Sequence, residues 1–150
     1  MGLAQFIAKV LRRFVWRWNA GDRTAARQAG DYGEREAARF LKSRGYKILA
    51  RQWKADCGCE IDLLARDGDT LVFVEVKTRS SEKFGHPADA VDSEKQRRVA
   101  RAAREYLRRL GRSDVYYRFD VVEVIGGAGG KRPECRLIPG AFSPDRSRYR

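Results

Sequence analysis

The segment Glu60–Arg79 reads EIDLLARDGDTLVFVEVKTR and predicts two strands joined by a tight turn. Asp67-Gly68 is a strong signal for a hairpin turn. Side chains alternate along a strand, so Glu75 and Lys77 share one face, while the valines at alternate positions take the other. A chain with this segment is therefore expected to build a sheet that carries charged groups on an otherwise apolar strand.

The length of the turn decides where Asp62 lies. If the connection holds two or four residues, Asp62 lies directly opposite Phe73 or Glu75, and either register puts it on the face of Glu75 and Lys77. An odd connection without a bulge would break this alignment. An even connection therefore predicts two carboxylates and one ammonium group on one patch of the sheet.

This patch has two interpretations. The run Leu71–Val74 is typical of a central strand covered on both faces, and partly burying a carboxylate pair is costly unless a cation neutralises it. Hard oxygen ligands suit Mg²⁺ or Mn²⁺, and a lysine beside such a metal is typical of a phosphodiesterase site. The alternative is a solvated Glu-x-Lys face on an edge strand, with Asp62 on the surface near the turn. The spacing alone does not choose between the two.

The charge of the chain indicates a polyanionic partner. The chain has 150 residues and a formal net charge of +12 at pH 7, so we expect one domain whose partner is a nucleic acid or, as the second choice, an anionic membrane surface. A hydrophobic content of 43% excludes a wholly disordered basic chain. Neither property decides whether the protein forms a homodimer.

The cysteines favour a reducing compartment. Their odd number and the lack of a secretion signal predict a cytoplasmic protein with free thiols. Cys57-Gly58-Cys59 has the form of half a zinc clip, but no second pair of soft ligands follows at zinc spacing. Two small residues that lead into a strand are the favoured interpretation.

Two helical patterns precede the first strand. Residues 3–18 place apolar side chains at helical spacing, and the basic residues lie mostly off that stripe. A helix docked on protein is favoured over a membrane-surface helix or a nucleic-acid arm, and the basic residues interrupt any transmembrane stretch. A second helix is predicted over about residues 24–44, with Gly45 at its end.

Glu34 in this second helix has two interpretations. It could be the capping-box partner of Asp31, or a further carboxylate that reaches the patch. Gly30 and Gly33 are unusual inside a helix. They permit the close approach of a strand, a metal or a phosphate backbone, or they mark where the helix begins.

The remaining elements follow a simple order. Strands are predicted over 46–51, 115–125 and 135–138, and a loop over 80–92. A helix begins at the capping box of Ser93 and ends near Leu110. Its outer surface is very basic, which is either a solvated face or a wall for phosphates. The residues predicted to bind nucleic acid are Lys95, Arg97, Arg98 and Arg101, together with Arg79 at the end of the hairpin.

A series of motifs runs through the middle of the chain. The motifs are Gly33-Glu34-x-x-Ala37, Phe40-Leu41-x-x-x-Gly45-Tyr46-x-Ile48-Leu49, Glu60-Ile61-Asp62-Leu63, Leu71-Val72-Phe73-Val74-Glu75-Val76-Lys77-Thr78-Arg79, Phe84-Gly85-x-Pro87-x-x-Ala90-Val91 with Lys95, and Arg118-Phe119-Asp120-Val121-Val122. With these motifs the sequence resembles the YraN family, whose fold belongs to the restriction-endonuclease-like PD-(D/E)xK superfamily. The Pro-Asp pair is absent because Ile61 precedes Asp62, and Cys59 and Gln52 stand where the family usually has Gly and Asn.

The resemblance implies a fold and domain limits. It implies an α/β fold with an αβββαβ core, a mixed central sheet flanked by helices, and an extra N-terminal helix. The expected parts are an amphipathic basic extension over residues 1–22, an endonuclease-like domain over 23–142 and a basic tail over 143–150.

The resemblance also implies a site, since the family is similar in fold to archaeal Holliday-junction resolvases, which are Mg²⁺-dependent nucleases. Asp62, Glu75 and the backbone carbonyl of Val76 would ligate Mg²⁺ or Mn²⁺, Lys77 would position water, and Glu34 would complete the acidic set. The expected function is structure-selective hydrolysis of DNA, which is favoured over RNA. The alternative is a nucleic-acid-binding module that keeps the fold without turnover and acts with a partner protein.

Overall fold

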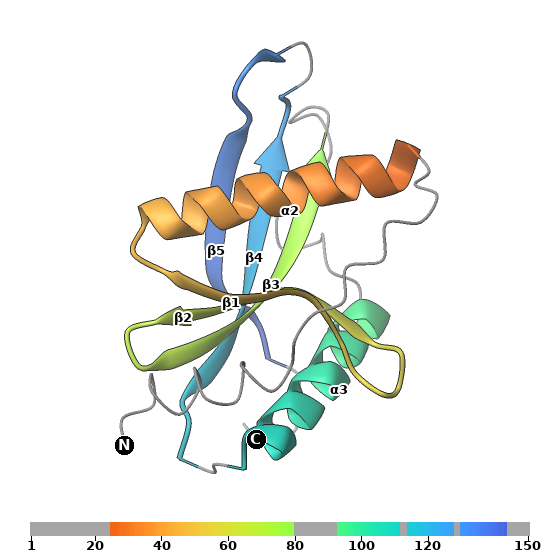
Figure 1. The fold of residues 1–150 in the computed structure, drawn as a ribbon, viewed down its shortest axis with the longest axis vertical. Helices are drawn as coiled ribbons and strands as arrows, with labels where there is room; N and C mark the ends of the chain where they lie inside the picture. The colour runs from red at the N-terminus through yellow and green to blue at the C-terminus, as the bar shows by residue number, and fades with distance from the viewer. Residues whose placement is uncertain (1–24, 80–92, 112–113, 128–129, 144–150) are drawn as a thin grey trace.

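The described part of the chain forms a helix, three strands, a second helix and two final strands (Figure 1). This computed structural model describes residues 25–79, 93–111, 114–127 and 130–143. The elements are α2 (Ala25–Ser43), β1 (Lys47–Lys54), β2 (Glu60–Asp67), β3 (Thr70–Arg79), α3 (Ser93–Leu110), β4 (Tyr117–Ile125) and β5 (Glu134–Phe142). The five described strands form one sheet in the order β1-β2-β3-β4-β5. The β3–β4 pair is parallel and the other three pairs are antiparallel, so the predicted α/β class and mixed sheet are confirmed.

Strand β3 is the central strand of this sheet. It pairs with β2 on one side and with β4 on the other. The side chains of Leu71–Val74 are completely buried, as their uninterrupted apolar run predicts. The interpretation of Glu75 and Lys77 as a solvated edge is therefore wrong.

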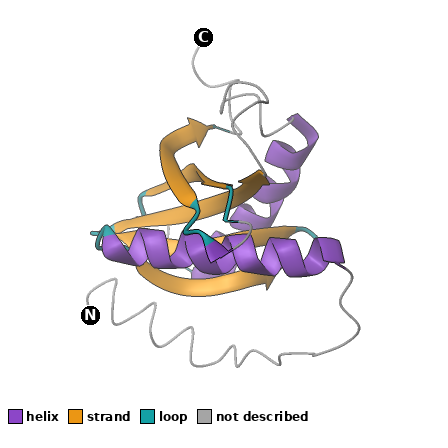
Figure 2. Cartoon of the chain, turned by 90° about the horizontal axis from the view of Figure 1, so that it is seen from above, coloured by secondary structure: helices purple, strands orange, loops and turns teal. Residues whose placement is uncertain are grey.

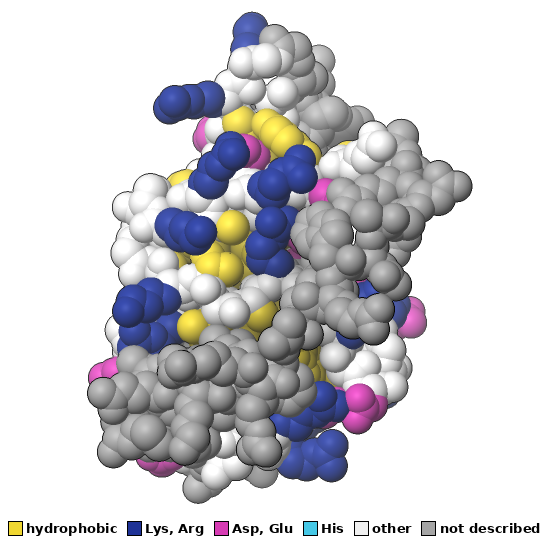
Figure 3. Space-filling model, in the orientation of Figure 1, with side chains coloured by type: hydrophobic (Ala, Val, Ile, Leu, Met, Phe, Trp, Pro, Cys, Tyr) yellow, Lys and Arg dark blue, Asp and Glu magenta, His cyan; other side chains and the backbone are white. Residues whose placement is uncertain are grey.

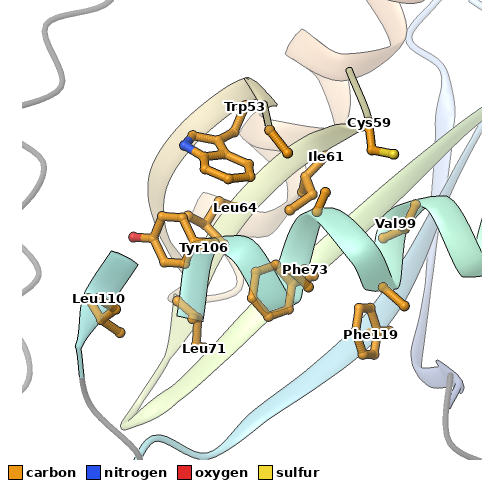
Figure 4. Close-up of a cluster of buried hydrophobic side chains, with 14 residues drawn as sticks. Trp53, Cys59, Ile61, Leu64, Leu71, Phe73, Val99, Tyr106, Leu110 and Phe119 are labelled. Atoms are coloured by element: carbon orange, nitrogen blue, oxygen red, sulfur yellow. The ribbon is translucent and has the colours of Figure 1, made fainter. Parts of the chain in front are cut away.

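Helices cover both faces of the sheet (Figure 2). Phe73 of β3 packs in a cluster with Val99 and Tyr106 of α3, and Figure 4 shows the Phe73 side chain between those of Tyr106 and Val99. The neighbouring side chain Val74 packs in a second cluster with Leu41 of α2. Because adjacent residues of a strand point to opposite faces, α2 and α3 lie on opposite sides of β3.

Several predicted boundaries differ from the structure. The first strand continues to Lys54, the fourth begins at Tyr117, and the last spans Glu134–Phe142 rather than four residues. This last strand pairs with β4 along much of its length, which a local pattern interrupted by proline and glycine does not reveal. The predicted extension 1–22, with its helix 3–18, lies outside the described residues, as do the loop 80–92 and the tail beyond Ser143.

The two glycines of α2 have different surroundings. A Cβ atom added at Gly33 would lie 2.1 Å from Oγ1 and 3.3 Å from Cβ of Thr78 on β3. A Cβ at Gly30 would meet nothing within 4 Å. Gly33 thus permits the close approach of a strand, which is one of the predicted alternatives. Neither glycine marks the start of the helix, because α2 begins at Ala25.

We predict that alanine has opposite effects at these two positions. Gly30→Ala should raise the free energy of unfolding by about 0.5–1 kcal/mol, because alanine loses less backbone freedom in a helix than glycine does. Gly33→Ala should be less stable than Gly30→Ala by about 1–3 kcal/mol, because Thr78 must move. Urea denaturation of both variants, repeated with Thr78→Ala, measures the difference. If both substitutions change the free energy of unfolding equally, in the wild type and in Thr78→Ala, the close packing of Gly33 against Thr78 does not contribute to stability.

Candidate metal centre

The hairpin turn sets the position of Asp62. Gly68, with a φ of 56°, and Asp69 form the connection, since Asp67 at the end of β2 pairs with Thr70 at the start of β3. The connection therefore holds an even number of residues, as the predicted alignment requires. The register runs from this pair to the pair of Leu63 and Val74, and a regular continuation of it would place Asp62 opposite Glu75.

The Asp62 carboxylate lies against β3. The backbone N–H of Val76 donates a hydrogen bond to Asp62 Oδ2 at 2.9 Å. This bond spans the two strands and fixes one carboxylate oxygen beside the peptide that follows Glu75. The predicted proximity of Asp62 to Glu75 is thus present in the structure.

Glu75 is an acidic side chain in an apolar environment. It is 3% exposed, and its Oε2 atom has no hydrogen-bond partner among the described residues. Its Oε1 atom lies 3.6 Å from Nζ of Lys77 and 3.3 Å from Nζ of Lys95. Burial, and then the negative charge of Asp62, raise the pKa of Glu75 to about 7, although both lysines act in the opposite direction. The folded protein therefore holds this carboxylate at a cost that a further cation would reduce.

Glu34 reaches the same region from α2. It is 8% exposed, and burial followed by repulsion from Asp62 raises its pKa to about 7. Its Oε2 atom has no hydrogen-bond partner in the described part of the chain and lies 3.8 Å from a guanidinium nitrogen of Arg51. Its interpretation as a capping-box partner of Asp31 is wrong, because α2 begins well before Asp31.

Strands β1 and β2 are distorted next to Asp62. Ile61 packs in the cluster against α3, whereas Leu63 packs in the cluster against α2, although residues two apart in a regular strand share a face. On β1, Gln52 has a φ of 50°, which is uncommon for a residue other than glycine. Its side-chain amide donates a hydrogen bond to Oδ1 of Asp31 at 2.8 Å. Such irregular backbone is found more often at functional sites than elsewhere.

The donor set fits a hard divalent cation that takes oxygen ligands. Asp62 and Glu75 offer carboxylate oxygens, and Glu75 Oε2 is buried without a partner. Within the described residues, no three side chains of the His, Cys, Asp and Glu types are grouped closely enough to form a complete ligand cluster. A cation at Asp62 and Glu75 would need further oxygens, as Mg²⁺ usually obtains from backbone carbonyls and water.

The residues predicted to bind nucleic acid fall into two groups. Arg97, Arg98 and Arg101 are exposed on α3. Lys95 and Arg79 are instead half-buried and paired with buried carboxylates: Lys95 with Glu75, and Arg79 with Glu123, whose Oε1 lies 3.4 Å from the Arg79 Nε atom. Figure 3 also shows Lys and Arg side chains spread over the face that α2 crosses, so the basic surface is wider than α3.

Sequence reasoning missed three parts of this site. The basic pattern of α3 predicts that Lys95 faces phosphates, but the packing of α3 brings its ammonium group to Glu75. The pattern around Arg51 predicts only a strand, although its Nε is buried and has no hydrogen-bond partner among the described residues. Glu123, which is 3% exposed, is paired with Lys77 in the parallel register of β3 and β4. Its isolated position in an apolar strand was the available signal.

Comparison with known proteins places the chain in a family. The sequence model of the uncharacterised protein family UPF0102 matches residues 33–124. The UPF0102 protein of Symbiobacterium thermophilum is 53% identical over 117 residues, which are 78% of this chain and 98% of the relative. The chain belongs to the UPF0102 family. The UPF0102 protein of Caldicellulosiruptor saccharolyticus is 44% identical over 116 residues, and that of Rhodococcus jostii 46% over 113 residues. They cover 77% and 75% of this chain and 98% and 94% of the relatives.

UPF0102 is the YraN family of the sequence analysis, so that resemblance is confirmed. The matched residues include Glu34, Asp62, Glu75, Lys77 and Lys95, and they end within β4. None of the described helices of this UPF0102 protein is both long and apolar enough to span a membrane.

Proposed function

We propose that this UPF0102 protein is a metal-dependent nuclease with a restriction-endonuclease-like core that hydrolyses phosphodiester bonds of DNA and selects DNA structure rather than sequence. The observation that carries the proposal is the Glu75 carboxyl group, which is buried, lies beside Asp62 and has one oxygen to which no described residue donates a hydrogen bond. Nucleic-acid binding alone does not require buried carboxylates, which repel a phosphate backbone unless a cation intervenes.

Asp62, Glu75 and the backbone carbonyl of Val76 would hold Mg²⁺ or Mn²⁺. When bound, such an ion supplies a water of lowered pKa and neutralises charge on the phosphate. The Val76 N–H fixes one oxygen of Asp62, and the second carboxylate oxygen remains as a potential ligand. Glu34 would complete the acidic set through water, because it lies on α2 close enough to Asp62 for the negative charge of Asp62 to raise its pKa.

The positively charged side chains near the site would act on the anionic substrate. The Lys77 ammonium group, 3.6 Å from Glu75 Oε1, would orient the attacking water or stabilise the negative charge that develops on the phosphate. Lys95 lies 3.3 Å from the same oxygen and balances the charge of Glu75. The exposed arginines of α3, including Arg97, Arg98 and Arg101, would hold the backbone without reading its bases.

A panel of DNA structures tests this proposal. The full-length protein is incubated with Mn²⁺ and with labelled branched, flapped, single-stranded and duplex DNAs. We expect cut products from branched or single-stranded DNA in excess over those from plain duplex. Asp62→Asn, purified in parallel, should bind the same DNAs and cut none of them, which controls for a contaminating nuclease. Binding without cleavage by the wild-type protein would overturn the proposal in favour of a non-catalytic binding module.

A further inference from the structure

The turn between β1 and β2 brings two thiols together. The N–H of Ala55 donates to the carbonyl of Cys59, and the N–H of Gly58 donates to the carbonyl of Ala55, both at 2.9 Å. Gly58 has a φ of 76°, which permits this tight turn at little steric cost. Cys57 and Cys59 flank Gly58 in this turn, so the backbone places the two cysteines close to each other.

The two thiols have different surroundings. Cys57 is exposed, whereas Cys59 is 4% exposed and packs in the apolar cluster with Val99 of α3. The hydrogen bond from Cys59 lowers the pKa of the Cys57 thiol, and the same bond, together with burial, raises the pKa of Cys59. The positive charge of Arg101 favours the thiolate of both. An accessible, stabilised thiolate beside a second thiol is typical of a reactive pair.

Polar contacts of Asp56 hold the turn between β1 and β2 against α3. The carboxylate of Asp56 lies 2.6 Å from a guanidinium nitrogen of Arg109. The backbone N–H of Asp56 donates to both carboxylate oxygens of Glu105, at 3.0 and 3.1 Å. These contacts hold the residue before Cys57 in place, so they fix the turn that carries both cysteines.

We propose that Cys57 and Cys59 form a thiol–disulfide exchange site that reacts with small-molecule disulfides. The Cys57 thiolate attacks one sulfur of the disulfide, a mixed disulfide forms, and the other sulfur leaves as a thiolate. The Cys59 thiol then loses its proton and attacks the sulfur of Cys57. This step forms the Cys57–Cys59 disulfide and releases the second small thiol. The small disulfide is reduced to two thiols, and the protein loses two hydrogen atoms.

The bond formed would be readily reversible. Only one residue separates the two cysteines, and strained or exposed disulfides are the more easily reduced ones. The site uses none of the carboxylates of the metal centre, so it stands independently of the proposed nuclease activity.

The test uses the full-length reduced protein and glutathione disulfide. Mass spectrometry of the peptide that contains residues 57–59 should show the loss of two hydrogen atoms, reversed by dithiothreitol. Cys135 on β5 is the internal control, because it is half-buried and burial raises the pKa of its thiol. Cys57 should react at least about tenfold faster than Cys135.

Two variants identify the role of each thiol. Cys59→Ala should retain a stable glutathione adduct on Cys57, because the second thiol that would release it is missing. Cys57→Ser should leave Cys59 unmodified at the same exposure time. A lasting adduct on Cys57 in the wild-type protein would overturn the proposal. A Cys57 that reacts no faster than Cys135 would overturn it as well, and this comparison requires no variant.

Discussion

Lys77→Ala should cut DNA about 10²–10³-fold more slowly than the wild-type protein at every pH, the range that removal of one group that stabilises developing negative charge produces. Lys77 lies on the same strand as Glu75, and its Nζ atom is 3.6 Å from Oε1 of Glu75. Its proposed role is in the reaction rather than in binding, so the affinity for DNA should change little. Single-turnover cleavage rates and a binding assay without added metal measure the two effects.

Lys95→Ala is the matched control for this prediction. Lys95 approaches the same carboxylate oxygen at 3.3 Å, but it comes from the beginning of α3. It lowers the pKa of Glu75 more than Lys77 does, so its removal should raise that pKa further. Cleavage by Lys95→Ala at limiting metal concentration should therefore decline at a higher pH than in the wild type, and it should recover in more alkaline solution. Equal losses for both variants at all pH values would contradict separate roles for the two lysines.

Glu75→Gln should be more stable than the wild-type protein at pH 8.5 in the absence of metal, by roughly 1–3 kcal/mol. The pKa of Glu75 is raised from 4.5 to about 7 in the folded protein, so the folded state binds a proton that the unfolded chain has already released. Stability from this group is therefore fully present below pH 4.5 and is lost as the pH rises through about 7. A shift of this size corresponds to roughly 3 kcal/mol, which sets the upper limit.

Urea denaturation between pH 5 and 9 measures this effect. The advantage of Glu75→Gln should shrink as the pH falls below 7, because the wild-type side chain is then neutral as well. Glu134→Gln on β5 is the control, since Glu134 is exposed and its removal should change stability by less than about 0.5 kcal/mol. A Glu75→Gln protein that is less stable than the wild type at pH 8.5 would mean that the lysines already compensate the buried charge.

The sequence was sufficient to predict the central part of the site. The hairpin signal at Asp67-Gly68 and the two-residue period of strands determine which side chains of β2 and β3 meet, and both are local properties. The uninterrupted apolar run of β3 likewise predicts its central place in the sheet. The proximity of Asp62 to Glu75 follows from these rules alone.

The rest of the site depends on packing that no local pattern records. Lys95 reaches Glu75 because of the way α3 lies on the sheet. Glu34 meets Arg51 only after α2 has packed on the face away from α3. The positive φ of Gln52 lies where β1 runs beside the distorted part of β2, and a glutamine in the sequence does not predict such a backbone conformation. The long β5 forms because β4 offers a complete edge, although its own residues include Pro139 and Gly140.

Calorimetric titration with Mg²⁺ tests the metal centre without any assumption about the substrate. The wild-type protein should bind the ion with measurable heat, and it should bind more weakly as the pH falls below 7, where protons compete for Glu75. The variant that carries both Asp62→Ala and Glu75→Ala, with its folding verified by circular dichroism, should give only the heat of dilution. Equal and negligible heats for the two proteins would contradict a divalent cation at these carboxylates.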